Sequence, residues 1–260
     1  MKLLDLNIGI KLDNTKQVLD FIKKENADIC TFQEAMNGID NNCYEEFKSK
    51  NKLTEIKEYE YNAFAPLYIA SEITKNNIAV KSFGGKAEQG SLILSKYKIK
   101  KHLNQFYYNE YQYSYDATHF RKKDWCRSIQ NTILEINDQE IQIINIHGIW
   151  TKDKLGDERT IMQTNFILDK IRKDIPVIIV GDFNLLPNSE SIKLLDKVLI
   201  NLIKEYNIKS TRPSFDDGLD KGNIVCDYIF INDKIKVNDF KVINTNISDH
   251  LPLIIDFDIV

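Results

Sequence analysis

The hydrophobic and polar positions along this chain form patterns that predict strands and helices in turn. The clearest pattern is residues 177–180 (VIIV), four consecutive β-branched residues before Gly181, which predict a strand buried on both faces. That strand ends at Asp182 and Asn184, whose side chains share one face because they are two positions apart. A carboxylate that is buried without a partner costs several kcal/mol. The pair is therefore either part of a polar turn or part of a functional site.

A strand–helix–strand pattern occurs twice. The first copy predicts a strand over Leu3–Ile10, a helix from a cap at Asn14 or Thr15 to Asn26, and a strand from Ala27 that terminates at Gln33-Glu34. The second predicts a strand over Glu140–Ile146, a helix from Asp157 to about Arg172, and the strand before Asp182. Such a unit usually makes a right-handed crossover between strands of one sheet. Polar residues end the strands of both copies (Asn7 and Glu34, then His147 and Asp182), which suggests two similar halves packed face to face.

The remaining patterns predict an α/β protein with further strands. Ile129–Ile136 and Glu140–Ile146 predict a hairpin around Asn137-Asp138, and Gly84-Gly85 predicts a break before a strand over Gln89–Lys96. Residues 37–75 predict a short helix followed by irregular or strand structure. The last part predicts a helix from Asn188 or Ser189 to about Leu199, a loop over Ser210–Gly222, and strands over Ile224–Ile231, Ile235–Ile243 and Leu253–Val260. No linker or composition shift divides residues 1–260, so we expect one domain.

Composition narrows the class of protein. The chain has 260 residues, of which 43% are hydrophobic and 28% charged, as in ordinary globular proteins. Its net charge of -3 gives no overall attraction to nucleic acid. The four scattered cysteines predict buried thiols in a reducing compartment. The N-terminus does not resemble a signal peptide, and no apolar run approaches the roughly 18 residues of a membrane span. We therefore expect a cytoplasmic protein without stable membrane insertion.

Polar residues stand at the ends or edges of several predicted strands: Asn7, Glu34, His147, Asp182, Asn184, Asp227, Asp249 and His250. If these ends converge, their carboxylates would repel one another and take up protons unless a cation lay among them. Oxygen ligands favour a hard ion such as Mg²⁺, with Mn²⁺ as a possible substitute, over Zn²⁺. Imidazoles and further carboxylates would remain to hold a water and a phosphate. The set therefore predicts metal-assisted hydrolysis of a phosphoester.

These residues lie in motifs that resemble those of the endonuclease/exonuclease/phosphatase superfamily, which includes DNase I. The motifs occur in the family's order: LNIG (Leu6–Gly9), FQE (Phe32–Glu34), GSLILSK (Gly90–Lys96), IHG (Ile146–Gly148), GDFN (Gly181–Asn184), DYIF (Asp227–Phe230) and SDHLPL (Ser248–Leu253). Each motif is weak alone, but the ordered set spans nearly the whole chain and is specific. The resemblance implies a four-layer α-β-β-α sandwich of the DNase I-like type. Two packed, mixed β-sheets would have helices outside and the site at one end.

The resemblance also implies a role for each matching residue. Glu34 resembles the principal metal ligand, with Asn7 and Asp249 close to the ion directly or through water. Asp182 resembles the residue that orients or deprotonates the attacking water. Asn184 resembles the neighbouring residue that contacts the phosphate.

On the phosphate side, His250 resembles the histidine that stabilises the phosphorane-like state, and Asp227 the carboxylate that fixes its tautomer. An imidazole with an ordinary pKa near 6.5 needs such a partner to stay charged at neutral pH. His147 matches a second phosphate-side histidine of the DNase I and sphingomyelinase branches. Arg127 stands where several members place a phosphate-binding arginine, although its CRS context is hardly a motif.

Several other polar residues have simpler interpretations. We expect His102 and His119 to face solvent or lie in loops, and Arg159 and Gln163 to serve helix packing or the surface. Glu88 could pair with His147, but a surface position is the default.

The segment Phe106–Trp125 interleaves aromatic residues with Arg121, Lys122 and Lys123. It could stack bases and meet phosphates, or it could form a strand with one aromatic face packed on the body. We favour packing, and we expect substrate selection in this part of the chain.

Three classes of function compete. The leading hypothesis is a Mg²⁺-dependent phosphodiesterase, with nucleic acid as the commonest substrate in the superfamily. The second is a phosphatase or phosphodiesterase that acts on a lipid or small-molecule phosphoester at the same site. The third is a catalytically inactive binding module, against which the intact Glu34, Asp182, Asp249 and His250 argue. We expect a monomer, and the sequence does not choose the substrate.

Overall fold

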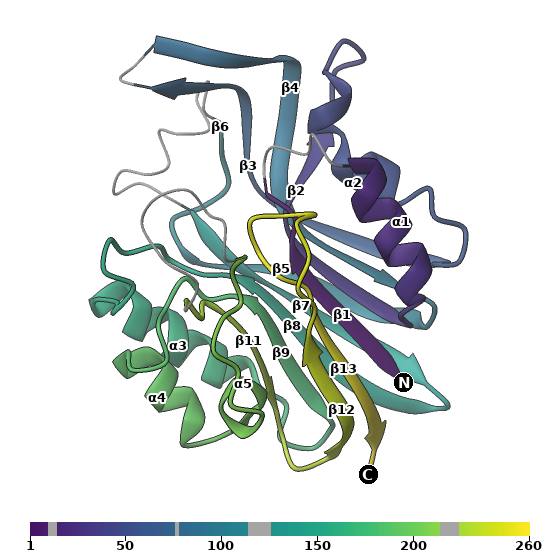
Figure 1. Ribbon diagram of the computed structural model, residues 1–260, viewed down its shortest axis with the longest axis vertical. Coiled ribbons are helices and arrows are strands. Elements are labelled where there is room, and N and C mark those ends of the chain that lie inside the picture. Colours follow the sequence, from purple (N-terminus) through teal and green to yellow (C-terminus); the bar gives the residue numbers. More distant parts are fainter. Residues whose placement is uncertain (10–14, 76–77, 114–125, 214–223) are drawn as a thin grey trace.

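Two β-sheets packed face to face, with helices on their outer sides, form the body of the protein. The computed structural model describes residues 1–9, 15–75, 78–113, 126–213 and 224–260. Figure 1 shows α1 and α2 on one side of the sheets and α3, α4 and α5 on the other. The predicted α/β sandwich with two packed sheets and outer helices is therefore confirmed.

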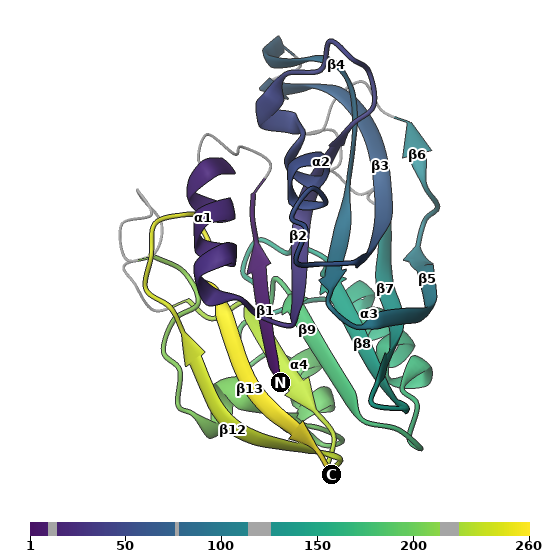
Figure 2. The same cartoon turned by 90° about the vertical axis from the view of Figure 1, so that its right-hand side faces the viewer.

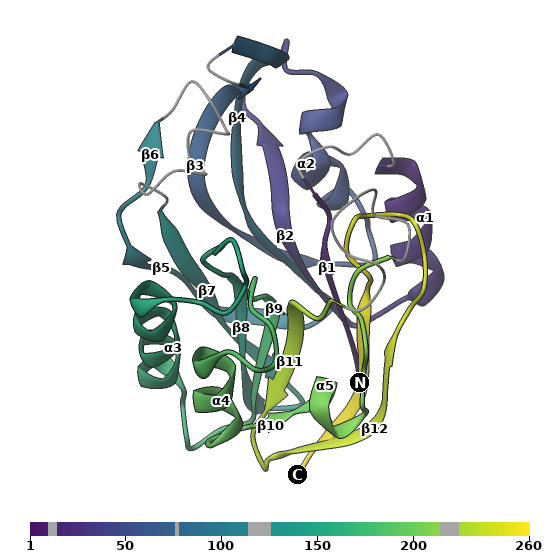
Figure 3. The same ribbon diagram turned by 60° about the vertical axis from the view of Figure 1, so that its left-hand side comes forward.

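Within the described residues, the first sheet has seven strands in the order β12-β13-β1-β2-β4-β3-β6. Their bounds are β1 (Lys2–Asn7), β2 (Ile29–Gly38), β3 (Tyr61–Lys75), β4 (Ile78–Ser95), β6 (Gln112–Tyr113), β12 (Ile235–Val242) and β13 (Leu253–Ile259). The strands β3 and β4 extend beyond the rest of both sheets (Figures 1 and 3). The sheet is mixed, because β1 pairs in parallel with β2 but antiparallel with β13.

The second sheet, in the same described part of the chain, has six strands in the order β10-β11-β9-β8-β7-β5. Their bounds are β5 (Lys98–Tyr108), β7 (Arg127–Ile136), β8 (Gln139–His147), β9 (Val177–Asp182), β10 (Ile200–Asn201) and β11 (Asp227–Ile231). It too is mixed, because β8 and β9 run parallel while β9 and β11 run antiparallel. The parallel pairs β1–β2 and β8–β9 confirm both predicted strand–helix–strand units.

The helices cover the outer faces through short apolar stripes. Their bounds are α1 (Thr15–Glu25), η1 (Glu45–Phe47), α2 (Ser49–Leu53), α3 (Glu158–Lys170), α4 (Glu190–Asp196) and α5 (Leu202–Glu205). In α1, Val18 and Ile22 pack with Leu4 and Cys30 on the first sheet, beside β1 in Figure 2. Asp157 caps α3 and Ser189 caps α4, as the sequence predicts.

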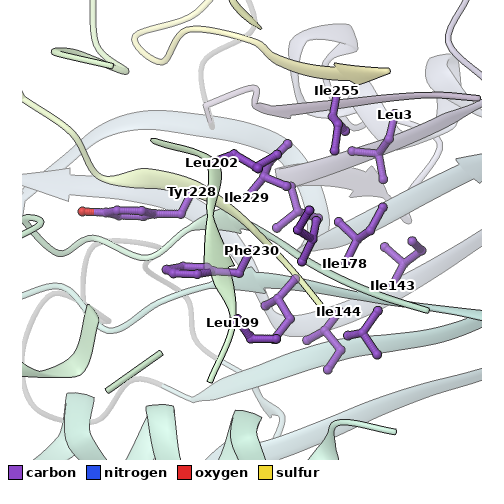
Figure 4. Close-up of a cluster of buried hydrophobic side chains, with 14 of the residues drawn as sticks. Leu3, Ile143, Ile144, Ile178, Leu199, Leu202, Tyr228, Ile229, Phe230 and Ile255 are labelled. Atoms are coloured by element: carbon purple, nitrogen blue, oxygen red, sulfur yellow. The ribbon is translucent and has the colours of Figure 1, made fainter. Parts of the chain in front are cut away.

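A continuous apolar core joins the two sheets. Figure 4 shows Leu3 and Ile255 of the first sheet beside Ile143 and Ile178 of the second. Phe230 of the second sheet points away from its neighbour Ile229, and Leu199 lies on the side of this sheet nearer the helices. The β-branched runs in β8 and β9 are therefore apolar on both faces because both faces are covered.

One expectation about the strands is wrong, and one strand is not predicted. The predicted break at Gly84-Gly85 is wrong, because β4 runs through both glycines. A Cβ on Gly84 would lie 2.6 Å from the carbonyl oxygen of Asn42, and φ there is +74°. These glycines thus permit close approach of a neighbouring loop rather than ending the strand. The edge strand β5 is not predicted, because the lysines at 98, 100 and 101 hide its alternation.

Other expectations agree with the fold. Asn137 and Asp138 form the hairpin turn between β7 and β8, with positive φ at both, as a two-residue hairpin loop requires. All four cysteines are buried and free.

Among the residues described, no helix is long and apolar enough to span a membrane. Residues 114–125 lie outside the described chain; they include His119 and the three basic residues of the aromatic segment, Arg121, Lys122 and Lys123.

Candidate active site

The strand ends converge as the sequence predicts. In the second sheet, the pairing of β9 places Asp182 directly opposite His147 of β8 on one side and Asp227 of β11 on the other. Asn7 ends β1 of the first sheet, and the Ser248 hydroxyl, in the loop before β13, donates to its carbonyl oxygen at 2.6 Å. This loop lies over the end of β1 in Figure 1, drawn in yellow. Both sheets thus contribute to one site.

Asp182 lies at the centre of this site and is 2% exposed. Its Oδ2 atom accepts hydrogen bonds from Asn7 Nδ2 at 3.1 Å and Asn184 Nδ2 at 3.3 Å. His250 Nε2 lies 3.6 Å and His147 Nε2 3.8 Å from the same oxygen. Burial raises the pKa of Asp182, although the nearby His250 opposes the shift.

Asn184 fixes the other oxygen of that carboxylate. Its backbone has φ of +58°, a left-handed conformation that asparagine tolerates, and its N–H donates to Asp182 Oδ1 at 2.8 Å. Its side-chain oxygen accepts from Lys154 Nζ at 3.2 Å. Lys154 is a basic residue of the site that no motif in the sequence marks, because it comes from the loop before α3.

Glu34 reaches the site from a β-bulge, which corrects the expectation that its strand ends there. The strand β2 continues to Gly38, and its pairing with β4 shifts between Phe32 and Ala35. Glu34 has φ of +60°, so the bulge turns its side chain toward Asn7 Nδ2, which lies 3.5 Å away. Burial raises the pKa of Glu34, and the nearby Asp249 carboxylate raises it further.

His250 and Asp227 form a buried pair. The His250 Nδ1 atom lies 2.8 Å from Asp227 Oδ1, and the Thr211 hydroxyl donates to Asp227 Oδ2 at 2.6 Å. Burial disfavours both charges, but their mutual attraction outweighs it. The pKa of His250 is therefore well above its ordinary value and that of Asp227 is below it. The predicted tautomer-fixing contact is thus present.

His147 has the opposite electrostatic setting. It is 6% exposed, and its Nε2 atom lies 3.7 Å from Glu34 Oε1. Burial lowers its pKa well below the ordinary value, and the charges of Arg127 and His250 lower it further. The two site histidines therefore differ: Asp227 favours the charged form of His250, whereas burial favours the neutral form of His147.

Arg127 begins β7 and is 2% exposed, so it is a buried residue rather than a surface arginine. Its charge acts on His147 and interacts with Glu34, so it lies close to the site. Burial lowers the pKa of Arg127 itself, and the nearby Tyr107 partly offsets this shift. The predicted role in phosphate binding stays a prediction.

Arg212 is, with Lys154, a residue of the site that the sequence does not predict. Its Nη1 atom contacts His250 Nε2, and its Nη2 atom lies 3.2 Å from Asp249 Oδ2. A guanidinium donates to Nε2 only while that nitrogen lacks a proton. The contact and the charged imidazole therefore exclude each other. No motif signals Arg212, since it lies in a loop some fifteen positions before DYIF.

The remaining polar residues have structural roles. Glu88 does not pair with His147; it accepts from Asn37 Nδ2 and the Tyr111 hydroxyl, each at 2.8 Å. Gln163 is a buried residue of α3, as helix packing predicts, and its side chain accepts from the Ile149 N–H at 2.8 Å. His102 is half-buried in β5 rather than in a loop or fully solvent-facing.

The residues fit a divalent cation. Glu34 and Asp249 are two carboxylates close enough for Asp249 to raise the pKa of Glu34, a repulsion that a hard cation would relieve. Asn7 turns its amide nitrogen to Asp182, while its Oδ1 accepts from the Gly9 N–H at 3.0 Å. Direct ligation by Asn7 therefore stays a prediction.

A second group of potential ligands lies deeper. Among the described residues, Asp182, Cys226, Asp227 and His250 are all buried and offer ligand atoms within 4.8 Å of one another. Thiol and imidazole ligands favour a softer ion than Mg²⁺, and the Asp227–His250 hydrogen bond already uses two of these side chains. By ligand chemistry, the carboxylates on the Glu34 side suit a hard cation better than this deeper group does.

The sequence from Asn7 to His250 matches the family model of the endonuclease/exonuclease/phosphatase family. The chain belongs to this family. Its members are hydrolases that act on phosphoester bonds, and membership supports a metal-dependent phosphoesterase. No curated protein sequence matches this chain.

Solved structures with the same fold are similar over the whole chain. An endonuclease/exonuclease/phosphatase from Beutenbergia cavernae DSM 12333 superposes with a TM-score of 0.75 at 12% identity, covering 100% of this chain and 71% of that one. A family protein from Leptotrichia buccalis C-1013-b gives 0.69 at 19% identity, with 99% of both chains covered. Truncated Caenorhabditis elegans TDP2 gives 0.66 at 17% identity, covering 98% of this chain and 96% of that one. At these identities the likeness establishes the fold.

Proposed function

We propose that this protein is a Mg²⁺-dependent phosphodiester hydrolase, with nucleic acid as its substrate class. The observation that carries the proposal is the surroundings of Asp182 Oδ2. Two amide N–H donors and two imidazoles lie within 3.8 Å of this buried oxygen. A carboxylate held in this way beside a second acidic group, Glu34, suits the activation of a water next to a metal-bound phosphate.

Asp182 would act as the base. Burial raises the pKa of its carboxylate, which makes the group a stronger proton acceptor than a surface aspartate. The Asn7 and Asn184 amides hold its orientation. In the reaction the water oxygen bonds to phosphorus, a water proton passes to Asp182, and the bond to the leaving oxygen breaks.

His250 and His147 would have different roles around the phosphate. The Asp227 carboxylate keeps His250 charged, so its Nε2–H can stabilise the charge that develops on the phosphoryl oxygens. His147 is neutral and can donate a hydrogen bond without adding charge. Lys154 adds a positive charge through its contact with Asn184.

Glu34 and Asp249, with Asn7, would hold the metal ion. When bound, Mg²⁺ offsets the negative charge of the phosphate oxygens as a Lewis acid. Mn²⁺ has the same preference for oxygen ligands and is expected to substitute for it.

A substrate panel tests the proposal. RNA, single- and double-stranded DNA, phospholipid headgroups and an activated monoester are incubated with the protein, in Mg²⁺ and in EDTA. We expect cleavage of nucleic acid in Mg²⁺ only. Metal-independent cleavage would contradict the mechanism. Exclusive turnover of the monoester or of a lipid or small-molecule phosphoester would replace the nuclease assignment with a phosphatase or phosphodiesterase at the same site.

A further inference from the structure

Arg212 bridges two residues of the site that are assigned different tasks. Its Nη2 atom lies 3.2 Å from Asp249 Oδ2, on the metal side, and its Nη1 atom contacts His250 Nε2, on the phosphate side. The side chain of Arg212 is 20% exposed and that of Asp249 is 55% exposed. One guanidinium thus contacts both the residue that would bind the ion, Asp249, and the residue that would contact the phosphate, His250.

The backbone beneath Arg212 is firmly held. Thr211, which precedes it, is fully buried; its N–H donates to the Ile224 carbonyl and its carbonyl accepts from the Leu251 N–H, both at 2.8 Å. The Ser210 hydroxyl donates to the Arg212 carbonyl at 2.9 Å. Arg212 therefore starts from a fixed Cα that is tied to the loop carrying Asp249, and a change of partner involves its side chain alone.

Asp249 cannot bind the Arg212 guanidinium and a divalent ion equally well at the same time. A carboxylate shared between a guanidinium and a divalent ion places two positive charges side by side, which costs free energy at close range. His250 Nε2 faces a similar choice, because the atom that Arg212 contacts is the one that must reach the phosphate. Binding of ion and substrate therefore requires Arg212 to leave its present position.

We propose that Arg212 is a phosphate-binding residue that exchanges partners on loading. In the protein without ligands it neutralises Asp249 and occupies His250 Nε2. When an ion takes Asp249, the guanidinium moves onto the oxygens of the substrate phosphate. This inference rests on the proposed function, because it deepens the account of the same site.

The chemistry of the side chain supports this exchange. A guanidinium offers a planar fork of N–H donors that matches two phosphate oxygens at once. Its present partner Asp249 is more than half exposed. Water and dissolved ions weaken such a contact, so a stronger anion can replace it.

The first test measures metal binding by the metal-free protein, without substrate. Mn²⁺ is titrated into the wild type and Arg212→Gln, and free Mn²⁺ is followed by electron paramagnetic resonance. Losing a partly exposed competitor for Asp249 is expected to tighten Mn²⁺ binding about two- to fivefold. Lys154→Gln is the matched control, because it removes a positive charge of the same site that contacts Asn184 rather than Asp249.

The Asp249→Asn background completes this test. If Arg212 competes through Asp249, adding Arg212→Gln to Asp249→Asn leaves Mn²⁺ affinity unchanged. Equal tightening in Lys154→Gln, unchanged or weaker binding in Arg212→Gln, or tightening that persists in the Asp249→Asn background would each overturn the inference. Glu34→Gln separates this failure from failure of the proposed function: if Mn²⁺ binding does not depend on Glu34, the metal site itself is wrong.

The second test concerns the substrate. With saturating Mg²⁺, Arg212→Gln should lower kcat/KM for an activated diester by about 10-fold or more, since charge-assisted hydrogen bonds to phosphate are lost. Arg212→Lys keeps the charge without the fork and should restore part of that loss. A purely structural role would give equal losses in both variants, together with lower thermal stability. Full activity of Arg212→Gln would also overturn the inference.

Discussion

At the residue scale, burial and pairing give similar side chains opposite properties. His250 and His147 are both almost fully buried, but His250 lies beside the Asp227 carboxylate and His147 lies near the charge of Arg127. The Asp227 carboxylate therefore favours the charged form of His250, and burial together with Arg127 favours the neutral form of His147. One site thus contains both a cation and a neutral donor for a phosphate.

Asp227→Asn tests this division. The amide keeps the shape of the side chain but removes the charge, so the pKa of His250 should fall and its charged form should be lost at lower pH. The alkaline limb of the pH–rate profile should move to lower pH, with a rate loss of about 10²-fold or more. Nuclear magnetic resonance of the His250 ring gives the pKa directly. An unchanged His250 pKa would mean that Asp227 does not control it.

At the element scale, irregular backbone places the acids. The bulge in β2 aims Glu34, and Gly181 lets β9 approach β8 closely just before Asp182. A Cβ on Gly181 would lie 2.1 Å from the Ile146 carbonyl oxygen, and φ there is +132°. The position before the central carboxylate therefore requires glycine.

Gly181→Ala should lower both stability and activity. The added methyl group must push β8 and β9 apart and accept a strained φ, for which we expect a loss of about 1–3 kcal/mol in the free energy of unfolding. Urea unfolding measures this loss, and diester hydrolysis measures the displacement of Asp182. Wild-type stability together with wild-type activity would show that the two strands separate without cost.

The elements differ in how far the sequence predicts them. Strands with long apolar runs, such as β9, are predicted because their pattern depends only on burial. The edge strand β5 is not, because its lysines face water and its pairing comes from β7. The bulge at Glu34 depends on the register between β2 and β4, which no local pattern contains.

Site residues, like strands, are predicted where a local sequence pattern marks them. The predicted site residues converge because strand ends carry Asn7, His147 and Asp182 to one place. A bulge brings Glu34 there, and the loop before β13 brings Asp249 and His250. Arg212 and Lys154 come from loops whose course is set by distant contacts, such as that of Thr211 with Asp227. One domain, a monomeric state and a cytoplasmic location stay predictions.

At the scale of the whole molecule, a buried polar layer joins the two sheets beneath the site. Gln33 Nε2 of the first sheet donates to Asn145 Oδ1 of the second at 2.7 Å and to Asp5 Oδ1 at 2.8 Å. Asp5 Oδ2 has no hydrogen-bond partner in the described part of the chain. Burial raises the pKa of Asp5 from 3.8 to about 7.

This shift makes stability depend on pH. The folded protein holds the Asp5 proton more tightly than the unfolded chain. The stability that this proton provides is therefore complete below about pH 3.8 and is lost as pH rises through about 7. Asp5→Asn keeps the acceptor oxygen and removes the charge. In EDTA it should gain on the order of a few kcal/mol at pH 8 and flatten this part of the pH dependence, measured by urea unfolding. No gain at pH 8 would show that Asp5 is readily ionised in the fold.

The central claim is that Asp182, held between both sheets, activates the water that attacks a phosphoester. The most direct measurement is hydrolysis of an activated phosphodiester in Mg²⁺ by the wild type and Asp182→Asn, with Mn²⁺ affinity determined for both. We predict a rate loss of about 10²-fold or more in Asp182→Asn, while Glu34-dependent Mn²⁺ binding persists. Full activity in Asp182→Asn would contradict the account.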